Sequence, residues 1–97
     1  MARLAVVEDE GVVALDLREL LSALGHDIVG VFDTGEEAAA KLPALEPELV
    51  LMDIHLRGKL DGIETAKLLQ TPRSTPVLFL TAFADAETVR RASAVGA

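Results

Sequence analysis

Short apolar runs alternate along the chain with segments in which apolar residues recur every three or four positions. The runs cover residues 4–7, 28–32, 49–52 and 77–80, and each predicts a β-strand. The run 49–52 is apolar at every position, which is typical of a central strand of a parallel sheet. Because helical segments separate the runs, we expect an α/β fold, a doubly wound parallel sheet with helices on both faces.

The first two helical segments carry start and stop signals. Gly25 follows the first apolar stripe and is expected to end that helix. Thr34 and Glu37 have the spacing of a capping box at the start of the second helix, which Pro43 is expected to shorten or kink. The apolar face of the first helix comprises Val13, Leu17, Leu20, Leu21 and Leu24.

Two further helices are expected after residue 60. Asp61 and Glu64 repeat the capping-box spacing, and Pro72 is expected to close off the third helix. Asp85 is expected to cap the fourth helix, with Gly96 as its stop. The apolar positions of these two helices are Ile63, Ala66 and Leu69, and Val89, Ala92 and Val95.

Composition narrows the possible functions. The 97 residues suit one small domain, and 51% of them are hydrophobic. The chain has no cysteine, which excludes a disulfide framework and a thiolate metal site. Nine basic and sixteen acidic residues give a net charge of −7, so the domain itself is not expected to bind nucleic acid or anionic membranes. No apolar run approaches the roughly 20 residues of a membrane helix, and we expect a cytoplasmic location.

Acidic or hydroxyl residues stand where three of the predicted strands end. Glu8 and Asp9 follow the first strand, Asp53 follows the third, and Thr81 follows the fourth. The carboxyl ends of parallel strands meet at one crevice, where folds of this class bind ligands. Carboxylates gathered there would repel one another unless a divalent cation joined them. Other acidic residues, Glu36 among them, are expected to be solvated surface charges.

These positions suggest phosphoryl chemistry. A carboxylate at Asp53 can act as a nucleophile toward a phosphoryl group and form an aspartyl phosphate. Glu8 and Asp9 can hold Mg²⁺, which prefers hard oxygen ligands. Each residue also has a plainer interpretation, because strand-end Asp and Thr often cap helices and an acidic pair before a helix compensates its dipole. The joint placement at three strand ends favours the chemical interpretation.

The chain resembles the receiver domains of two-component response regulators, of the kind related to the chemotaxis regulator. The matching segments are VVEDE at 6–10, LVLMDIHL at 49–56, DGIE at 61–64 and VLFLTA at 77–82. The resemblance implies a flavodoxin-like fold with strand order 2-1-3-4 over residues 1–97. It also implies a function, the acceptance of a phosphoryl group from a sensor histidine kinase or phosphotransfer protein, followed by a conformational switch.

The resemblance assigns roles to individual residues. Asp53 would be the phosphoacceptor, and Mg²⁺ or Mn²⁺ would be held by Glu8, Asp9, Asp53 and the backbone carbonyl of His55. Thr81 would be the switch hydroxyl, and the small residue Ala82 beside it would leave space for the phosphoryl group.

The chain also departs from the family pattern. Receivers carry a lysine near the end of a fifth strand and an aromatic switch residue before it, and both would lie beyond Ala97. We therefore expect an incomplete receiver whose fourth strand is an exposed apolar edge, through which the chain self-associates. The segment HLRGKLDG after Asp53 predicts a longer loop that Gly58 permits, with Arg57 and Lys59 as solvated cations.

Two other functions remain open at this point. A Mg²⁺-dependent phosphohydrolase also uses a strand-end aspartate, but it commonly has a second acid two residues later, where this chain has His55. A receiver-like domain used only for protein contact, without phosphorylation, is the other alternative. The residues do not select an output domain, a cognate kinase or a biological response.

Overall fold

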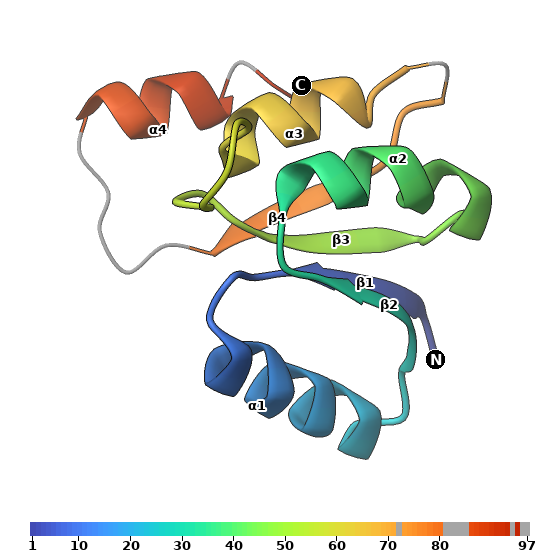
Figure 1. The fold of residues 1–97 in the computed structure, drawn as a ribbon. Helices are drawn as coiled ribbons and strands as arrows, with labels where there is room; N and C mark the ends of the chain where they lie inside the picture. The colour runs from blue at the N-terminus through green and yellow to red at the C-terminus, as the bar shows by residue number, and fades with distance from the viewer. Residues whose placement is uncertain (72, 81–85, 94, 96–97) are drawn as a thin grey trace.

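Four strands form one parallel sheet, and a helix follows each strand along the chain (Figure 1). The computed structural model describes residues 1–71, 73–80, 86–93 and 95. The strand order is β2-β1-β3-β4, which confirms the predicted order. The elements are β1 (Arg3–Val7), α1 (Gly11–Ala23), β2 (Asp27–Phe32), α2 (Gly35–Leu45), β3 (Leu49–Asp53), α3 (Gly62–Leu68), β4 (Val77–Leu80) and α4 (Ala86–Ser93).

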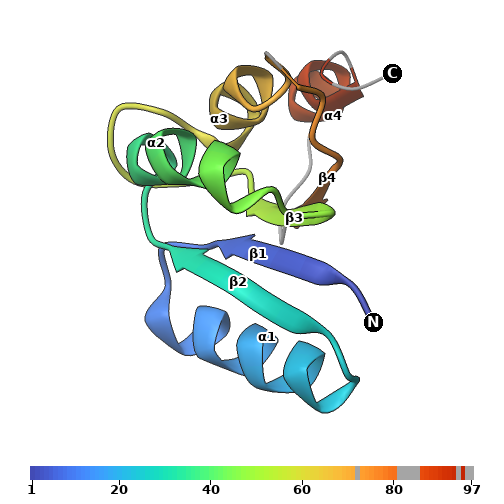
Figure 2. The same ribbon diagram turned by 90° about the vertical axis from the view of Figure 1, so that its right-hand side faces the viewer.

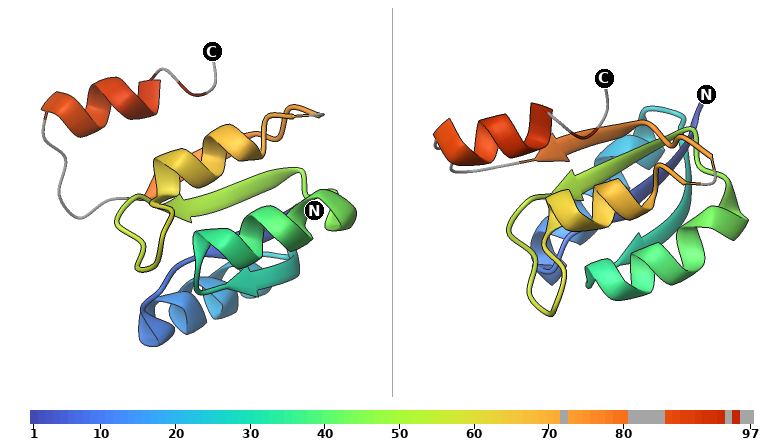
Figure 3. Two further views of the ribbon diagram at one scale, coloured as in Figure 1. Left: turned by 45° about the horizontal axis from the view of Figure 1, so that its top comes forward. Right: turned by 90° about the horizontal axis from the view of Figure 1, so that it is seen from above.

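Helices cover both faces of the sheet. The helix α1 lies on one face, and α2, α3 and α4 lie on the other (Figures 1 and 2). Seen from above, the second group of helices spans the sheet from β2 to β4 (Figure 3). This is the doubly wound arrangement expected from the alternation of strands and helices. None of the described helices is long and apolar enough to cross a membrane.

The main core lies between the sheet and the helices α2 and α3. Its members are buried apolar residues from both layers, each contributing about 1.5–3 kcal/mol when a large side chain is fully withdrawn from water. Met52 and Leu42 are among the largest fully buried side chains. The core cluster consists of Ala5, Val7, Phe32, Ala38, Leu42, Val50, Met52, Leu56 and Leu69.

The opposite face of the sheet is less completely covered. Ala14 is the buried residue of α1, whereas Leu24 at the end of the predicted apolar stripe is 66% exposed. Only part of the predicted apolar stripe therefore packs against the sheet. Strand β4 is last in the sheet order and its Leu78 is 52% exposed, as an exposed edge requires. Self-association through β4 stays a prediction.

The helix α2 does not end where the proline predicts. It continues through Pro43 to Leu45, so the expectation that Pro43 shortens the helix was wrong. Pro43 lies in the last turn, where the loss of one backbone hydrogen bond is tolerated more easily than in the middle of a helix. Leu42 is almost fully buried, and its packing holds this turn in place. The next residue, Glu46, caps the end of the helix and has the left-handed φ of 48°.

The start of α3 confirms the predicted capping box. Asp61 Oδ1 accepts a hydrogen bond of 2.8 Å from the Glu64 backbone N–H, and Glu64 Oε1 accepts one of 3.0 Å from the Asp61 N–H. Two backbone donors that the helix leaves unpaired are thereby satisfied. The stop signals predicted at Pro72 and Gly96 and the cap predicted at Asp85 lie outside the described residues.

Gly62, the first residue of α3, packs directly against the end of β3. Its N–H donates a 2.8 Å hydrogen bond to the Ile54 carbonyl, and a Cβ at this position would overlap the carbonyl oxygen of Asp53. We expect Gly62→Ala to lower the free energy of unfolding by about 1–3 kcal/mol, because a backbone atom cannot move aside. Urea unfolding of the two proteins measures the difference.

Gly11 provides a matched control for this substitution. It is also the first residue of a helix, and a Cβ there would meet nothing within 4 Å. Gly11→Ala should leave stability unchanged or raise it by up to about 1 kcal/mol. Equal effects of the two substitutions would show that the contact between Gly62 and β3 is unimportant.

Candidate functional site

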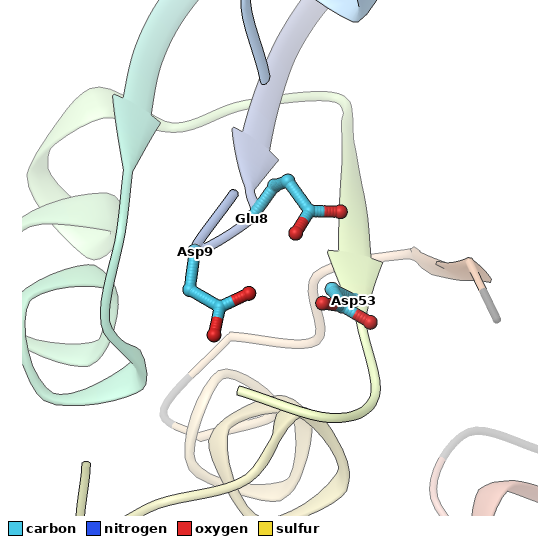
Figure 4. A group of neighbouring side chains, drawn as sticks. All are labelled: Glu8, Asp9 and Asp53. Carbon is cyan, nitrogen blue, oxygen red and sulfur yellow. The ribbon is translucent and has the colours of Figure 1, made fainter. Parts of the chain in front are cut away.

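Three carboxylates meet at the carboxyl ends of two neighbouring strands. Glu8 and Asp9 directly follow β1, and Asp53 is the last residue of β3. Strands β1 and β3 are paired so that Val7 lies beside Met52, which places the residues that follow side by side. One oxygen of each carboxylate lies within 4.8 Å of the others. Figure 4 shows the three side chains around one common space.

Backbone N–H groups orient each of the three carboxylates. Glu8 Oε2 accepts a 3.1 Å hydrogen bond from the Glu10 N–H. Asp9 Oδ2 accepts one of 3.2 Å from the Arg57 N–H, and Asp53 Oδ1 accepts one of 3.2 Å from the His55 N–H. Because each carboxylate retains a second oxygen, the group can still ligate a cation or attack an electrophile. The site is thus oriented in advance of any ligand.

Glu8 is the most perturbed acid of the site. Its pKa is raised to about 7, mainly by burial, since the residue is only 7% exposed, and also by the neighbouring Asp53. The hydrogen bond from the Glu10 N–H favours the charged form but does not outweigh these effects. A divalent cation would reverse this balance, because it would neutralise the repulsion among the three carboxylates. Oxygen donors of this kind suit hard ions such as Mg²⁺.

Arg57 takes a position that the sequence pattern did not predict. Its Nε lies 3.3 Å from Asp9 Oδ2, so the side chain forms an ion pair with a residue of the acidic site. The side chain is 79% exposed, as expected of a solvated cation, but it also pairs with the acidic site, which that expectation did not include. The contact joins residues 48 positions apart, and no local motif indicates it. Only the proximity of the loop after β3 to the end of β1 brings the two groups together.

Glu36 holds the loop that follows Asp53. Its Oε1 accepts a 2.9 Å hydrogen bond from the Leu60 N–H, and this bond lowers the pKa of Glu36. The carboxylate also lies against Gly58, whose φ of 99° favours glycine, as the predicted loop required. Glu36 is thus not only a solvated surface charge, and it ties the start of α2 to the loop beside the acidic site.

A cleft gives access to Asp53. Its volume is about 910 Å³, and it extends from the acidic residues along α1 toward the end of β4. Asp53, His55 and Arg57 line its polar part, and Val13 and Leu17 of α1 line its apolar part. Asp53 is half-buried, so its free oxygen can be reached while its backbone is fixed in the sheet.

The structure brings together Glu8, Asp9 and Asp53, the acidic set identified from the sequence. The side chain of His55 is exposed, and the role of its carbonyl as a metal ligand stays a prediction. Thr81 and Ala82 lie outside the described residues, and the lysine and the aromatic residue of the family pattern stay a prediction.

The raised pKa of Glu8 predicts a pH dependence of stability in the presence of a chelator. The folded protein holds the Glu8 proton up to about pH 7, whereas the unfolded chain loses it near pH 4.5. The contribution of Glu8 to the free energy of unfolding is therefore fully present below pH 4.5 and is lost as the pH rises toward 7. We expect Glu8→Gln to remove this loss and to be more stable than wild type at pH 8.

Urea unfolding from pH 4 to 8 tests this expectation. One pKa unit corresponds to about 1.4 kcal/mol, so the difference between the two proteins should grow by roughly that amount or more across the range. Carboxylates outside the acidic site have the same surroundings in both proteins, so their effects cancel in the comparison. A constant difference at every pH would contradict the raised pKa.

Comparison with known proteins extends what the geometry indicates. Residues 4–97 match the family described as the response regulator receiver domain. The transcriptional regulatory protein PdtaR of Mycobacterium tuberculosis is 37% identical over 95 residues, which are 98% of this chain and 46% of that protein. The chain thus spans less than half the length of the curated relatives it matches first.

Solved structures agree with this result. The signal receiver domain of a modulated diguanylate cyclase from Desulfovibrio desulfuricans G20 has a TM-score of 0.92 at 44% identity, over 98% of this chain and 75% of that chain. The response regulator PhyR from Brucella abortus has a TM-score of 0.78 at 36% identity, over 84% of this chain and 34% of that chain. With the fold, the strand order and the sequence match in agreement, the chain belongs to the receiver domain family of response regulators.

Proposed function

We propose that this domain accepts a phosphoryl group on Asp53 and thereby changes conformation in a two-component signalling pathway. The donor is the phosphohistidine of a sensor histidine kinase or phosphotransfer protein in the cytoplasm. The observation that carries the proposal is the convergence of Glu8, Asp9 and Asp53 within 4.8 Å at the ends of β1 and β3. Membership of the receiver family supports the same chemistry.

The chemical step follows from the position of Asp53. One carboxylate oxygen forms a bond to phosphorus while the phosphorus–nitrogen bond of the phosphohistidine breaks, and the imidazole keeps the electron pair and takes up a proton. Mg²⁺ or Mn²⁺ held by Glu8, Asp9 and Asp53 would supply positive charge for the transferring oxygens. The His55 N–H fixes one oxygen of Asp53, and the cleft beside it admits the donor.

The remaining roles belong to this proposal as well. The carbonyl of His55 completes the metal ligands, and Thr81 donates its hydroxyl to the phosphoryl group, with Ala82 leaving space beside it. The attraction of Thr81 to the phosphoryl group shifts the population of conformations at β4 and the helix after it. The net charge of −7 disfavours direct binding of nucleic acid by this domain.

A contact module without phosphorylation is the second candidate. It is favoured by the solved complex of the related PhyR from Bartonella quintana with the anti-sigma factor NepR, in which a receiver-containing protein has a protein partner. The phosphohydrolase alternative has no comparable support, and the position two residues after Asp53 is the exposed His55. Phosphorylation of Asp53 separates the two candidates.

Asp53→Asn should abolish phosphoryl acceptance. We expect wild-type protein incubated with Mg²⁺ and acetyl phosphate to gain the mass of one phosphoryl group, and the variant to gain none, because an amide is not a nucleophile toward phosphorus. Intact-mass spectrometry measures the adduct. Asp16→Asn is the control, since Asp16 is an exposed carboxylate on α1 and its loss should leave the adduct unchanged. The absence of an adduct in a folded form of the protein that also carries the lysine of the family pattern would refute the proposal and favour the contact module.

Arg57→Ala should strengthen Mg²⁺ binding. The ion pair between Arg57 and Asp9 must break before Asp9 ligates a cation with that oxygen, and an exposed pair of this kind contributes up to about 1 kcal/mol. We therefore expect up to about a fivefold increase in Mg²⁺ affinity, measured by calorimetric titration at constant salt.

Lys59→Ala controls for the change of net charge. Lys59 lies in the same loop with the same charge, but it interacts with Glu36 rather than with the acidic site. Its removal should change Mg²⁺ affinity less than the removal of Arg57. Equal effects would show that the loop charges act only at a distance.

A further inference from the structure

Helix α4 is joined to the start of α3 by an ion pair. Arg91 Nη2 of α4 lies 2.8 Å from Asp61 Oδ2, the cap residue of α3. The two side chains are 38% and 29% exposed, so the pair is partly withdrawn from water. Arg90, the preceding residue, is instead exposed and pairs with Glu87 of its own helix. Within the described residues, the Arg91–Asp61 pair is the only ion pair between α4 and another element.

The packing between α4 and the sheet is open. A cavity of about 380 Å³ lies between α4 and β4, lined by Val77 and Phe79 of the strand and by Ala92 and Val95 on the side of the helix. Among the described residues, apolar contacts across this space are fewer than in a closed core, and they stabilise one position of the helix only weakly. A single charged contact therefore has a large share in holding α4.

Asp61 also lies next to the backbone of the phosphoacceptor. The following residue, Gly62, donates a hydrogen bond to the Ile54 carbonyl and leaves no space for a Cβ against Asp53. The capping box holds Asp61 to α3 through Glu64. A displacement of the backbone at residues 53–54 is thus transmitted to Asp61 through atoms in contact, without passing through the β4 segment.

The charge of Asp61 is secured by its surroundings. Burial opposes ionisation of this carboxyl, but the hydrogen bond from the Glu64 N–H and the pairing with Arg91 outweigh it and lower the pKa of Asp61. The residue is therefore ionised at neutral pH, where the pair with Arg91 persists. The guanidinium is permanently charged.

We propose that the Arg91–Asp61 ion pair holds α4 in its position in the unphosphorylated domain and couples that helix to the backbone at Asp53. The coupling of α4 to Asp53 rests on the proposed function, whereas the role of the ion pair in holding α4 does not. Arg91 is a positioning residue in this scheme, because it contacts neither the phosphoryl group nor the metal ligands. Its partner Asp61 lies at the end of the loop that follows Asp53. The connection from Asp53 to α4 through this ion pair therefore does not involve Thr81.

Hydrogen exchange of the unphosphorylated, intact protein tests the first part. We expect Arg91→Gln and Asp61→Asn each to accelerate exchange of the α4 amides about two- to fivefold, the change that the loss of a partly exposed pair produces. Asparagine caps a helix as well as aspartate does, so exchange in α3 should not change. The double variant should exchange no faster than either single variant.

Arg90→Gln is the matched control, because it removes the same charge from the neighbouring residue of the same helix. In Arg90→Gln, the α4 amides whose exchange is accelerated by Arg91→Gln should exchange at the wild-type rate. Identical exchange of the two variants, or strictly additive effects of Arg91→Gln and Asp61→Asn, would overturn the proposal.

The coupling is tested with acetyl phosphate and Mg²⁺. Arg91→Gln should gain the phosphoryl mass as wild type does, whereas the change in α4 exchange on phosphorylation should be at least twofold smaller than in wild type. An undiminished change would overturn the coupling. If wild type gained no phosphoryl group, even in a form that carries the lysine of the family pattern, the proposed function and the coupling that rests on it would fall, and the exchange of the unphosphorylated variants would still decide whether the pair holds α4.

Discussion

The pairing of β1 with β3 is the constraint on which the site depends. It places Glu8 beside Asp53, and the close approach of their carboxylates, together with burial of Glu8, raises the pKa of Glu8 to about 7. The unfavourable electrostatic energy is maintained because the strands that carry these residues are buried, and rearranging them would expose Val7 and Met52 to water. Packing of the core thus stabilises an arrangement that the carboxylates alone would not adopt, as functional sites commonly require.

The loop after β3 extends this arrangement from the site to the helices. Glu36 holds the loop from the start of α2, and Arg57 pairs with Asp9 at the end of β1. Gly62 closes the loop against the backbone of Asp53. The same short segment therefore touches the acidic site, α2 and α3. A change at Asp53 meets a loop whose far end is fixed to two helices, and this rigidity is what allows a local event to reach a distant surface.

The helices on one face of the sheet differ in how firmly they are held. On one face α2 and α3 enclose the main core with β1 and β3. The helix α4 shares that face but is separated from β4 by a cavity, and a charged contact with Asp61 connects it to α3. Elements that move in signalling are drawn from the less stable parts of a structure. The contrast between the tightly packed α3 and the loosely packed α4 fits a domain in which one helix moves and its neighbours do not.

Much of the fold followed from local patterns in the sequence. Apolar runs indicate the four strands, and the capping box of Asp61 and Glu64 forms at the start of α3 as its spacing requires. The helix α2 continues two residues past Pro43, because the local preference of the backbone was outweighed by the burial of Leu42, while a kink at Pro43 stays a prediction. The apolar stripe predicted for α1 lies on one helix, but Val13, Leu20 and Leu24 are exposed. Their burial depends on how much of the sheet lies opposite the helix, and the periodicity of the sequence does not contain this information.

The sequence by itself determined the acidic set, since Glu8, Asp9 and Asp53 each follow an apolar strand and parallel strands end at one edge. The tertiary structure alone decided which groups surround that set. Arg57 and Asp9, like Leu60 and Glu36, are far apart along the chain, and Arg91 reaches Asp61 across 30 residues. Such contacts depend on the path of a loop and the placement of a helix. They leave no periodic signal, because a single long-range ion pair requires only two charges and no repeated pattern.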